Sequence, residues 1–375
     1  MARGRQVVRF RRAPHLVAYW RAGSLLLRNY AIARTAAGDP LICRVLDFCS
    51  DWRTEAQIRR NLGPDSSPFL PALLRTLVER SLLHRSDRPI DSRERAMASF
   101  DRWNPEAGFF HTATKDVRFW SAREAKREAR LQAALSAMPR PVLHVPNAAR
   151  LPLPAPVGDG DFPKVLRARR TWRRFSTQPV TAGELATILA LAVGVQKWVG
   201  SGRSKIPLKT SPSGGARHPI ECYVVVGRIE GVRAGVYHYA ADRHELERVR
   251  GPVPKDRIRA YLPQSGYFAD ASAVFFLTAA FERQLWRYPY SRAYRAALIE
   301  AGHVCQTLLL CSTWLGLAPF CVMALADSLI ERDLGIDGIR ESVLYAAGVG
   351  RPPSGTDWAP LPRGTLRTRR NPHLR

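Results

Sequence analysis

The stretch from Thr210 to Tyr239 constrains the fold of this chain more than any other part of the sequence. It begins with the small polar segment 211–216, in which paired glycines allow positive φ angles and a close approach of the backbone to a ligand. The segment leads into residues 220–226, a run rich in β-branched residues that predicts a buried strand, and 236–239 predicts a second strand. Such a loop could cradle a flat cofactor or a phosphate. It is more commonly an ordinary turn before a core strand.

Composition bounds the class of protein. The chain has 375 residues, of which 46% are hydrophobic, enough for two or three domains with a large core. It contains no apolar run of about 18 residues or more, and its N-terminus lacks the apolar segment of a secretory signal. The six cysteines form no C-x-x-C pair. We therefore expect free thiols, a cytoplasmic location, no membrane span and no metal.

The formal net charge of +26 needs an explanation, because it comes almost wholly from arginine. Three explanations compete: the codon bias of a GC-rich genome, an acidic peptide or other acidic partner, and nucleic acid. The arginines are dispersed over the whole chain rather than gathered on one motif. This dispersion favours codon bias first and an acidic peptide second, with nucleic acid the least favoured.

Residues 1–90 have the pattern of a small separate domain. Strands are predicted at 7–10, 16–20 and 25–27, followed by three helical patterns and a closing strand at Leu82 and Leu83. This order predicts a winged-helix-like module. Such a module could recognise a peptide or DNA, or serve only for packing.

Residues 91–160 are predicted to connect this module to the main domain. The capping box Ser121-x-x-Glu124 predicts a helix that ends near Met138. The proline-rich segment 139–156 predicts an extended linker. The main domain is therefore expected at 161–352, followed by a basic tail at 353–375.

Five features organise the main domain. Five arginines crowd residues 167–174, which suits either an anion site or a solvated helix end. A capping box at Thr181 predicts a helix to about residue 194, and 273–277 predicts a core strand. A long helix is expected at 291–317, with His303 on its mostly buried face. The other residues predicted on that face are Tyr294, Leu298, Ala301, Val304, Cys305 and Leu308. Asp327 is expected to cap a short helix, and 342–350 to form the last strand.

Five motifs occur in an order and spacing that resemble the SagB-type dehydrogenases, which are flavin-dependent azoline oxidases of the nitroreductase superfamily. They are R-R-T-x-R-x-F at 169–175, S-P-S-G-G-A-x-H-P at 211–219, G-V-Y-H-Y at 235–239, E-A-G-H at 300–303 and G-V-G-R-P at 348–352. The resemblance covers about residues 160–352. The N-terminal module also resembles the small winged-helix domain that many such proteins carry.

This resemblance implies an α+β, nitroreductase-like fold in which a central antiparallel sheet is flanked by helices, preceded by a small winged-helix-like domain. It also implies a homodimer with two FMN sites at the subunit interface, in which the long helix is the expected dimer element. The absence of a G-x-G-x-x-G motif after a strand agrees with this, since FMN is not held by a dinucleotide-binding fold in the family.

The resemblance further implies which residues hold FMN. The arginine segment would hold the phosphate, the ribityl chain and the pyrimidine edge of FMN, and the C-terminal glycine and arginine would also hold the phosphate. The small polar loop would line the face of the ring. The backbone of the segment 317–322 would lie near N5. The residues are Arg169, Arg170, Thr171 and Arg173; Pro212, Ser213, Gly214, Gly215 and Ala216; Pro319 and Cys321; and Gly350 and Arg351.

Catalysis is predicted to involve Tyr288 and Arg287, which stand where these oxidases often carry a lysine–tyrosine pair. Arginine cannot lose its proton at useful pH, so Tyr288 is the expected base and Arg287 would favour its phenolate form. His303 is the next candidate, and Trp286 and Tyr290 are expected to shape the pocket.

These features favour an FMN-dependent oxidoreductase that oxidises thiazoline or oxazoline rings to azoles in a ribosomally made peptide, with cyclodehydratase partner proteins. An NAD(P)H-dependent nitroreductase or flavin reductase is the alternative enzyme. A nucleic-acid- or peptide-binding protein with a degenerate flavin domain is the alternative of another class.

Overall fold

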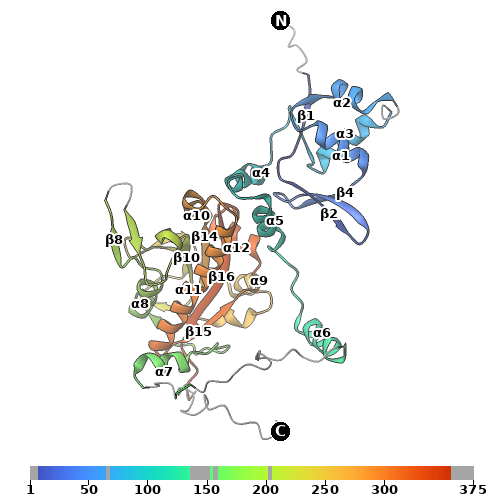
Figure 1. Cartoon of the computed structure of the whole chain (residues 1–375). Coiled ribbons are helices and arrows are strands. Elements are labelled where there is room, and N and C mark those ends of the chain that lie inside the picture. Colours follow the sequence, from blue (N-terminus) through green and yellow to red (C-terminus); the bar gives the residue numbers. More distant parts are fainter. Residues whose placement is uncertain (1–6, 65–67, 136–152, 155–158, 202–204, 356–375) are drawn as a thin grey trace. The chain divides into compact units, whose positions relative to one another are not determined.

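The computed structural model describes residues 7–64, 68–135, 153–154, 159–201 and 205–355 (Figure 1). Contacts between residues divide the chain into two compact units. The first comprises Met1–Lys115, Ala280–Ala297 and Asp337–Ser342, and the second Asp116–Ala279, Leu298–Ile336 and Val343–Arg375. The domain boundaries near residues 90, 160 and 352 stay a prediction, and most of the proposed proline-rich linker lies outside the described residues.

The first unit contains a three-stranded antiparallel sheet in the order β5 (Arg53–Thr54), β1 (Arg9–Arg12), β6 (Leu83–Arg85). Three helices, α1 (Pro40–Phe48), α2 (Glu55–Leu62) and α3 (Leu70–Glu79), pack on it. Their apolar side chains recur every three or four residues, so each helix presents one stripe to a shared core. Thr54 begins α2 with a reciprocal capping box to Gln57, which satisfies two backbone amides at that end.

A second antiparallel sheet in this unit forms the wing, with strands β2 (Leu16–Arg21), β3 (Ser24–Asn29) and β4 (Arg34–Ala37). Ala22 and Gly23 have positive φ and make the tight turn between β2 and β3. The winged-helix-like order predicted from the sequence is confirmed, although β4 and β5 were not predicted. The unit also contains α4 (Ser92–Met97), α5 (Pro105–Ala113) and α10 (Phe281–Arg287).

The second unit is built on a six-stranded sheet in the order β13-β12-β10-β14-β16-β15. Its strands are β10 (Ile220–Val226), β12 (Gly235–Ala240), β13 (Glu245–Arg250), β14 (Ala273–Ala280), β15 (Ala318–Val322) and β16 (Glu341–Gly350). Four neighbouring pairs have antiparallel registers. The fifth pair, β14 with β16, is also antiparallel, because Ser272 N bonds to Val349 O and Phe281 N to Arg340 O. The expected central antiparallel sheet is confirmed.

Helices surround this sheet (Figure 1). One face carries Tyr223, Val225, Val274 and Phe276, which pack with α9 (Lys255–Tyr261) and α12 (Asp327–Leu334). The alternate residues of β10 and β14 point to the opposite face and are equally buried, so both faces are covered. The second unit also contains α6 (Ala122–Leu135), α7 (Asp161–Ala168), α8 (Ala182–Ala192) and most of α11 (Arg292–Trp314), whose first residues belong to the first unit. The fold is α+β, as predicted.

Two side chains of α11 differ from the sequence prediction. Leu298 is 38% exposed and His303 is exposed, so neither belongs to the buried face. The buried stripe instead runs through Ala297, Ala301, Val304 and Leu308. Because an α-helix has 3.6 residues per turn, positions chosen at a fixed spacing of three or four residues gradually rotate around a long helix. Some of these apolar positions therefore lie outside the buried face. His303 is therefore not a buried core histidine.

Asp327 also differs from its predicted role. It is the first residue of α12 rather than its N-cap, which is Ala326 and makes no side-chain cap. Asp327 Oδ2 accepts a bond from Asp116 N at 3.1 Å, and Asp116 Oδ1 accepts one from Ser328 N at 3.0 Å. The helix N-terminus is thus capped by Asp116, a residue distant in sequence that sequence spacing could not identify.

All six cysteines are free thiols. Across the described ranges, no helix is both long enough and apolar enough to cross a membrane, and no cluster of His, Cys, Asp and Glu has the arrangement of a metal site.

Candidate functional site

The arginine-rich segment 169–175 lies along one end of the central sheet. It follows α7 in an extended conformation, with Arg169 at the helix C-cap. Trp172 N donates to Pro319 O at 3.0 Å, and Ser176 N donates to Arg351 O at 2.9 Å. These two bonds hold the segment beside the start of β15 and the end of β16. The structure thus brings together the predicted residues of the arginine segment, β15 and the C-terminal G-R pair.

Close packing explains the aromatic residue and the glycine in two of the motifs. A Cβ on Gly350 would lie 2.7 Å from Phe175 Cδ1, and a Cβ on Gly348 would lie 2.2 Å from Phe320 Cζ. Only glycine therefore allows the rings of Phe175 and Phe320 to lie against β16. Gly350 thus has a packing reason to be glycine, independent of any phosphate contact.

Arg351 is already engaged by protein groups. Its Nη2 lies 2.8 Å from Glu184 Oε2, and its Nε donates to Pro179 O at 3.0 Å. Glu184 also closes the capping box with Thr181 at the start of α8. Arg351 therefore ties the end of β16 to this helix N-terminus. The sequence predicted the capping box but not this ion pair.

Other arginines of the segment keep their charge available. In the described part of the chain, Arg169, Arg173 and Arg174 make no ion pair with a carboxylate. Arg170 lies over the ring of Trp172, 5.6 Å from its centroid. Several guanidinium groups on a backbone held by two hydrogen bonds form a donor set that suits a phosphate. The residues present therefore fit the anionic end of a cofactor such as FMN.

The small polar loop adopts an unusual backbone conformation. Gly215, Ala216 and His218 have φ angles of 59°, 50° and 43°. Such left-handed angles are unfavourable for residues other than glycine and often occur at functional sites. Positive φ, which the sequence predicted for the paired glycines, occurs at Gly215 but not at Gly214, and it was not predicted for Ala216 or His218.

The loop is held by α11. Ser211 is buried, and its Oγ lies 3.3 Å from Thr307 Oγ1. His218 Nδ1 lies 3.6 Å from Glu300 Oε1, with both side chains buried, and His218 N donates to Ser213 Oγ at 2.9 Å. His218 therefore helps to hold the loop against α11. Glu300 Oε2 is buried with no hydrogen-bond partner among the described residues.

The side chain of Cys321 lies among groups that favour its thiolate form. The Cys305 thiol of α11, a hydrogen bond from Tyr345 and the positive charge of Arg169 lower the pKa of Cys321, against the opposing effect of burial. The Tyr345 hydroxyl donates to Cys321 Sγ at 3.3 Å. The sequence predicted a role for the backbone at Cys321 and gave no signal for its side chain, because its partners come from three separate elements.

The predicted catalytic pair belongs to the first unit. Arg287 ends α10 and is exposed, and Tyr288, at its C-cap, is partly buried. Trp103 Nε1 donates to Tyr288 O at 3.1 Å, and the rings of Tyr288 and Tyr290 lie 5.8 Å apart. The backbone at Tyr288 is therefore anchored. The residues predicted to hold FMN belong to the second unit, so the catalytic role of the pair stays a prediction.

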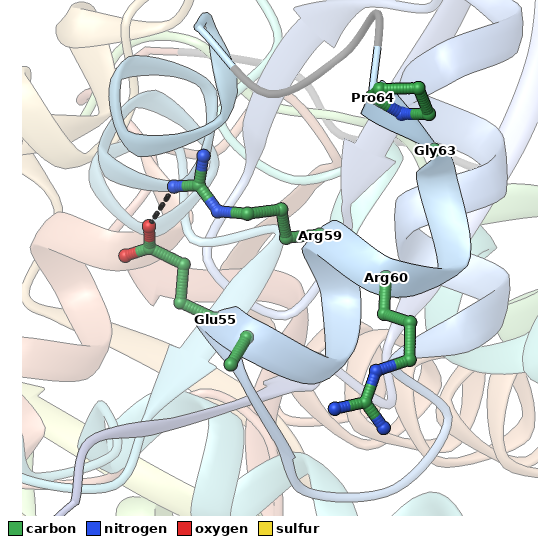
Figure 2. A pocket seen from close by; sticks show the side chains of 6 residues that line it. Glu55, Arg59, Arg60, Gly63 and Pro64 are labelled. Atoms are coloured by element: carbon green, nitrogen blue, oxygen red, sulfur yellow. Dashed lines mark hydrogen bonds and ion pairs between the residues drawn. The ribbon is translucent and has the colours of Figure 1, made fainter.

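The winged-helix-like module carries two hollows. One, of about 620 Å³, is lined by Glu55, Ala56, Arg59, Arg60, Gly63 and Pro64. Arg59 Nη2 donates to Glu55 Oε1 at 2.6 Å. Figure 2 shows Arg60 extending away from that pair. The other, of about 480 Å³, combines apolar residues of β1 and α3 with charged residues. Its lining residues are Val8, Phe10, Glu55, Pro71, Leu74, Arg75, Val78, Glu79, Arg85 and Arg88.

Comparison with known proteins identifies two relatives that each match part of this chain. A protein of Methanocaldococcus jannaschii that is named as a nitroreductase is 35% identical over 187 residues, which are 50% of this chain and 89% of that protein. The trifolitoxin-processing protein TfxB of Rhizobium leguminosarum is 36% identical over 149 residues, which are 38% of this chain and 39% of TfxB. The chain therefore spans well under half of TfxB.

A solved structure and a family model extend the comparison. The E. coli microcin synthetase McbBCD complex, with truncated pro-MccB17 bound, contains a chain that is 21% identical, with a TM-score of 0.46; the match covers 72% of this chain and 100% of that one. The nitroreductase family model matches residues 166–351, which include the anchored arginine segment, the small polar loop and both ends of the central sheet. Together with the M. jannaschii relative, this match shows that the chain belongs to the nitroreductase family.

Proposed function

We propose that this chain is an FMN-dependent oxidoreductase of the SagB type, which oxidises thiazoline or oxazoline rings to azoles in a ribosomally made peptide. The observation that carries the proposal is the anchored arginine segment beside β15 and β16, whose guanidinium groups at Arg169, Arg173 and Arg174 have no carboxylate partner among the described residues. Membership of a family of flavin oxidoreductases supports the cofactor. Similarity to a trifolitoxin-processing protein supports a peptide substrate.

Each part of the chain has a distinct task in this proposal. Arg169, Arg170, Thr171 and Arg173 bind the cofactor phosphate and the polar edge of the ring system, and the loop 212–216 offers backbone to the ring face. When bound, FMN supplies a two-electron acceptor for ring oxidation.

The remaining requirement is removal of a proton from the azoline carbon. Tyr288 takes this proton at its side-chain oxygen, and Arg287 is its neighbour in the chain. Trp103 holds the Tyr288 carbonyl and so limits movement of the backbone at this position.

Cofactor extraction tests the first half of the proposal. The purified protein is expected to be yellow and to release FMN on denaturation. Arg173→Ala is expected to weaken FMN binding by about tenfold or more, since a charge-assisted hydrogen bond contributes about 1.5–3 kcal/mol. Arg60→Ala, which removes an arginine of α2, is the matched control and should leave FMN affinity unchanged. A colourless protein that FMN cannot reconstitute contradicts the proposal.

Substrate oxidation tests the second half. A peptide carrying a thiazoline is expected to lose two hydrogens, measured by mass spectrometry, in the presence of oxygen. The competing activity is an NAD(P)H-dependent nitroreductase or flavin reductase, which the M. jannaschii relative favours. Rapid NAD(P)H oxidation with a nitroaromatic acceptor, combined with no azoline oxidation, selects that alternative. Flavin-free protein that binds duplex DNA or peptide selects a binding protein with a degenerate flavin domain.

The proposed assembly is a homodimer that works with cyclodehydratase partner proteins. Along α11, Ile299 and Trp314 are 59% and 56% exposed, and Leu298 is also accessible. Large apolar side chains left at the surface of one helix suit a subunit interface. Light scattering at moderate salt is expected to give the mass of a dimer, and a flavin-loaded monomer contradicts this assembly.

A further inference from the structure

The backbone at the end of the small polar loop is strained. His218 has a φ angle of 43° and directly precedes Pro219. A positive φ is unfavourable for a residue with a side chain, and a residue before proline normally adopts an extended conformation. Such a conformation persists only where surrounding contacts hold it. The contacts of His218 therefore decide whether the loop keeps its shape.

Hydrogen bonds inside the loop close it around Ser213. Ala216 N donates to Ser213 O at 3.1 Å, and His218 N donates to Ser213 Oγ at 2.9 Å. Arg217 N also donates to Gly214 O at 3.3 Å. Because these bonds lie within the loop, they fix its internal shape but not its place against α11.

Two contacts attach the loop to α11. Ser211 Oγ lies 3.3 Å from Thr307 Oγ1, and His218 Nδ1 lies 3.6 Å from Glu300 Oε1. Glu300 and Thr307 are seven residues apart, about two helical turns, so they lie on the same face of the helix. The loop is thus held at both ends, and the segment between them includes the residues 212–216 proposed to receive the ring of FMN.

The contact between His218 and Glu300 buries a carboxyl group that is incompletely bonded. The two side chains are 7% and 4% exposed, and Glu300 Oε2 has no hydrogen-bond partner among the described residues. By contrast, both carboxyl oxygens of the buried Glu94 in the first unit have a partner, in His84 and Asn29. A buried polar group without its hydrogen bonds lowers stability, so its presence calls for an explanation beyond packing.

We propose that Glu300 and His218 are positioning residues of the cofactor site, an inference that rests on the proposed function. Glu300 holds the imidazole of His218 against α11, and the amide of His218 holds Ser213. The segment 212–216 thereby keeps the backbone conformation that faces the flavin ring. The pair acts through this segment and not on the reacting atoms. Its cost in stability is retained because a preformed loop binds a cofactor more tightly than a loop that must first be ordered.

Titration of flavin-free protein with FMN, followed by the quenching of flavin fluorescence, tests this role. Glu300→Gln keeps the size of the side chain and is expected to weaken FMN binding about fivefold to tenfold, the range for the loss of one polar contact. Glu94→Gln is the matched control from the first unit and should keep the parent affinity. Urea unfolding establishes that each variant is folded.

Substitutions of His218 separate the side-chain contact from the backbone conformation. Asparagine adopts a positive φ more readily than most residues, whereas alanine does not. If the contact with Glu300 holds the loop, His218→Asn and His218→Ala should both weaken FMN binding. Because the two residues act as one unit, adding His218→Asn to Glu300→Gln should weaken binding little further. Parent affinity in His218→Asn, or two fully additive losses in the double variant, overturns the proposal.

Hydrogen exchange of the FMN-free protein gives a readout that needs no cofactor. The amides of residues 213–218 should exchange faster in Glu300→Gln than in the parent, while those of β10 should not change. If Glu300→Gln does not fold, His218→Asn serves for the same measurements. A parent protein that binds no FMN refutes the proposed function, and this inference with it. A parent that binds FMN, together with a Glu300→Gln variant of unchanged affinity or unchanged loop exchange, refutes only the inference.

Discussion

Replacing Asp333 by asparagine is expected to destabilise the second unit more than any other single loss of charge that we consider. Asp333 lies on α12 and is 8% exposed. Its carboxylate accepts bonds from Arg257 Nε at 2.6 Å and from Tyr261 Oη at 2.5 Å, and it pairs with Arg250 Nη1 at 2.6 Å. One carboxylate therefore joins α9, α12 and β13 around the core that covers one face of the sheet.

The size of the effect follows from burial. Removing one partner of a buried ion pair costs about 3–5 kcal/mol of unfolding free energy. Here the guanidinium groups can recover water, because the side chains of Arg250 and Arg257 are 52% and 36% exposed. We therefore expect Asp333→Asn to cost about 2–3 kcal/mol. Tyr261→Phe, which removes one bond to the same carboxylate, should cost about 1–2 kcal/mol.

Urea unfolding, monitored by tryptophan fluorescence, measures both effects at pH 7. Asp256→Asn is the matched control, because the Asp256 side chain is 92% exposed and pairs with Arg259 at the surface; its cost should stay within about 0.5 kcal/mol. The reasoning is refuted if Asp333→Asn and Asp256→Asn have equal free energies of unfolding.

The pH dependence gives a second readout of the same variant. The Arg257 hydrogen bond, assisted by Tyr261 and Arg250, holds the pKa of Asp333 well below its usual range. A depressed folded-state pKa contributes stability that is present above the unfolded pKa of about 3.9 and is lost as pH falls. The difference in unfolding free energy between the parent and Asp333→Asn should therefore be largest at pH 5 and should decrease as the pH falls toward 2. A difference that stays constant over this range contradicts the assignment.

Three further predictions concern the proposed activity, a second carboxyl group and the N-terminal module. Tyr288→Phe should retain FMN and fold but cut azoline oxidation by at least about a hundredfold, whereas Arg287→Lys should be milder than Arg287→Ala; a parent rate for Tyr288→Phe makes His303 the next candidate. Burial raises the pKa of Asp327 to about 6, with the neighbouring Asp116 charge adding to the shift. The stability that this carboxyl group contributes is present at low pH and is lost as pH rises through about 6. Between pH 4 and pH 7.5, the unfolding free energy of Asp327→Asn should therefore rise by about 1–2 kcal/mol relative to that of the parent. Urea unfolding that shows no such relative rise contradicts this prediction. If the winged-helix-like module recruits an acidic leader peptide or an acidic partner, its affinity for that partner, measured by fluorescence anisotropy, should fall as the salt concentration rises. Tight binding to random duplex DNA at physiological salt, with an even steeper salt dependence and no peptide binding, favours nucleic acid as the partner instead.

Local patterns in the sequence identified most of the elements of this fold. The β-branched run that became β10, the capping boxes at Ser121 and Thr181, and the winged-helix order of the first 90 residues all depend on neighbours within a few positions. Hydrophobic periodicity and capping chemistry are local, so the sequence alone was sufficient. The order of five short motifs was likewise sufficient to indicate the family.

The individual partners of site residues depended on contacts between segments far apart in the chain. Arg351 pairs with Glu184, Tyr345 donates a hydrogen bond to the Cys321 sulfur, and Asp116 caps α12 in place of the predicted Asp327. Side chains of the same types occur throughout a chain so rich in arginine, and sequence spacing does not say which of them come within hydrogen-bond distance.

The sequence by itself therefore determined the class of fold and many of the strands and helices that build it, and it predicted the segments proposed to supply the site. Only the tertiary structure decided which face of α11 is buried, which residue caps α12 and which carboxylate pairs with Arg351. These properties depend on burial and on distances of a few ångströms between elements, and both arise when the sheet and its helices pack together.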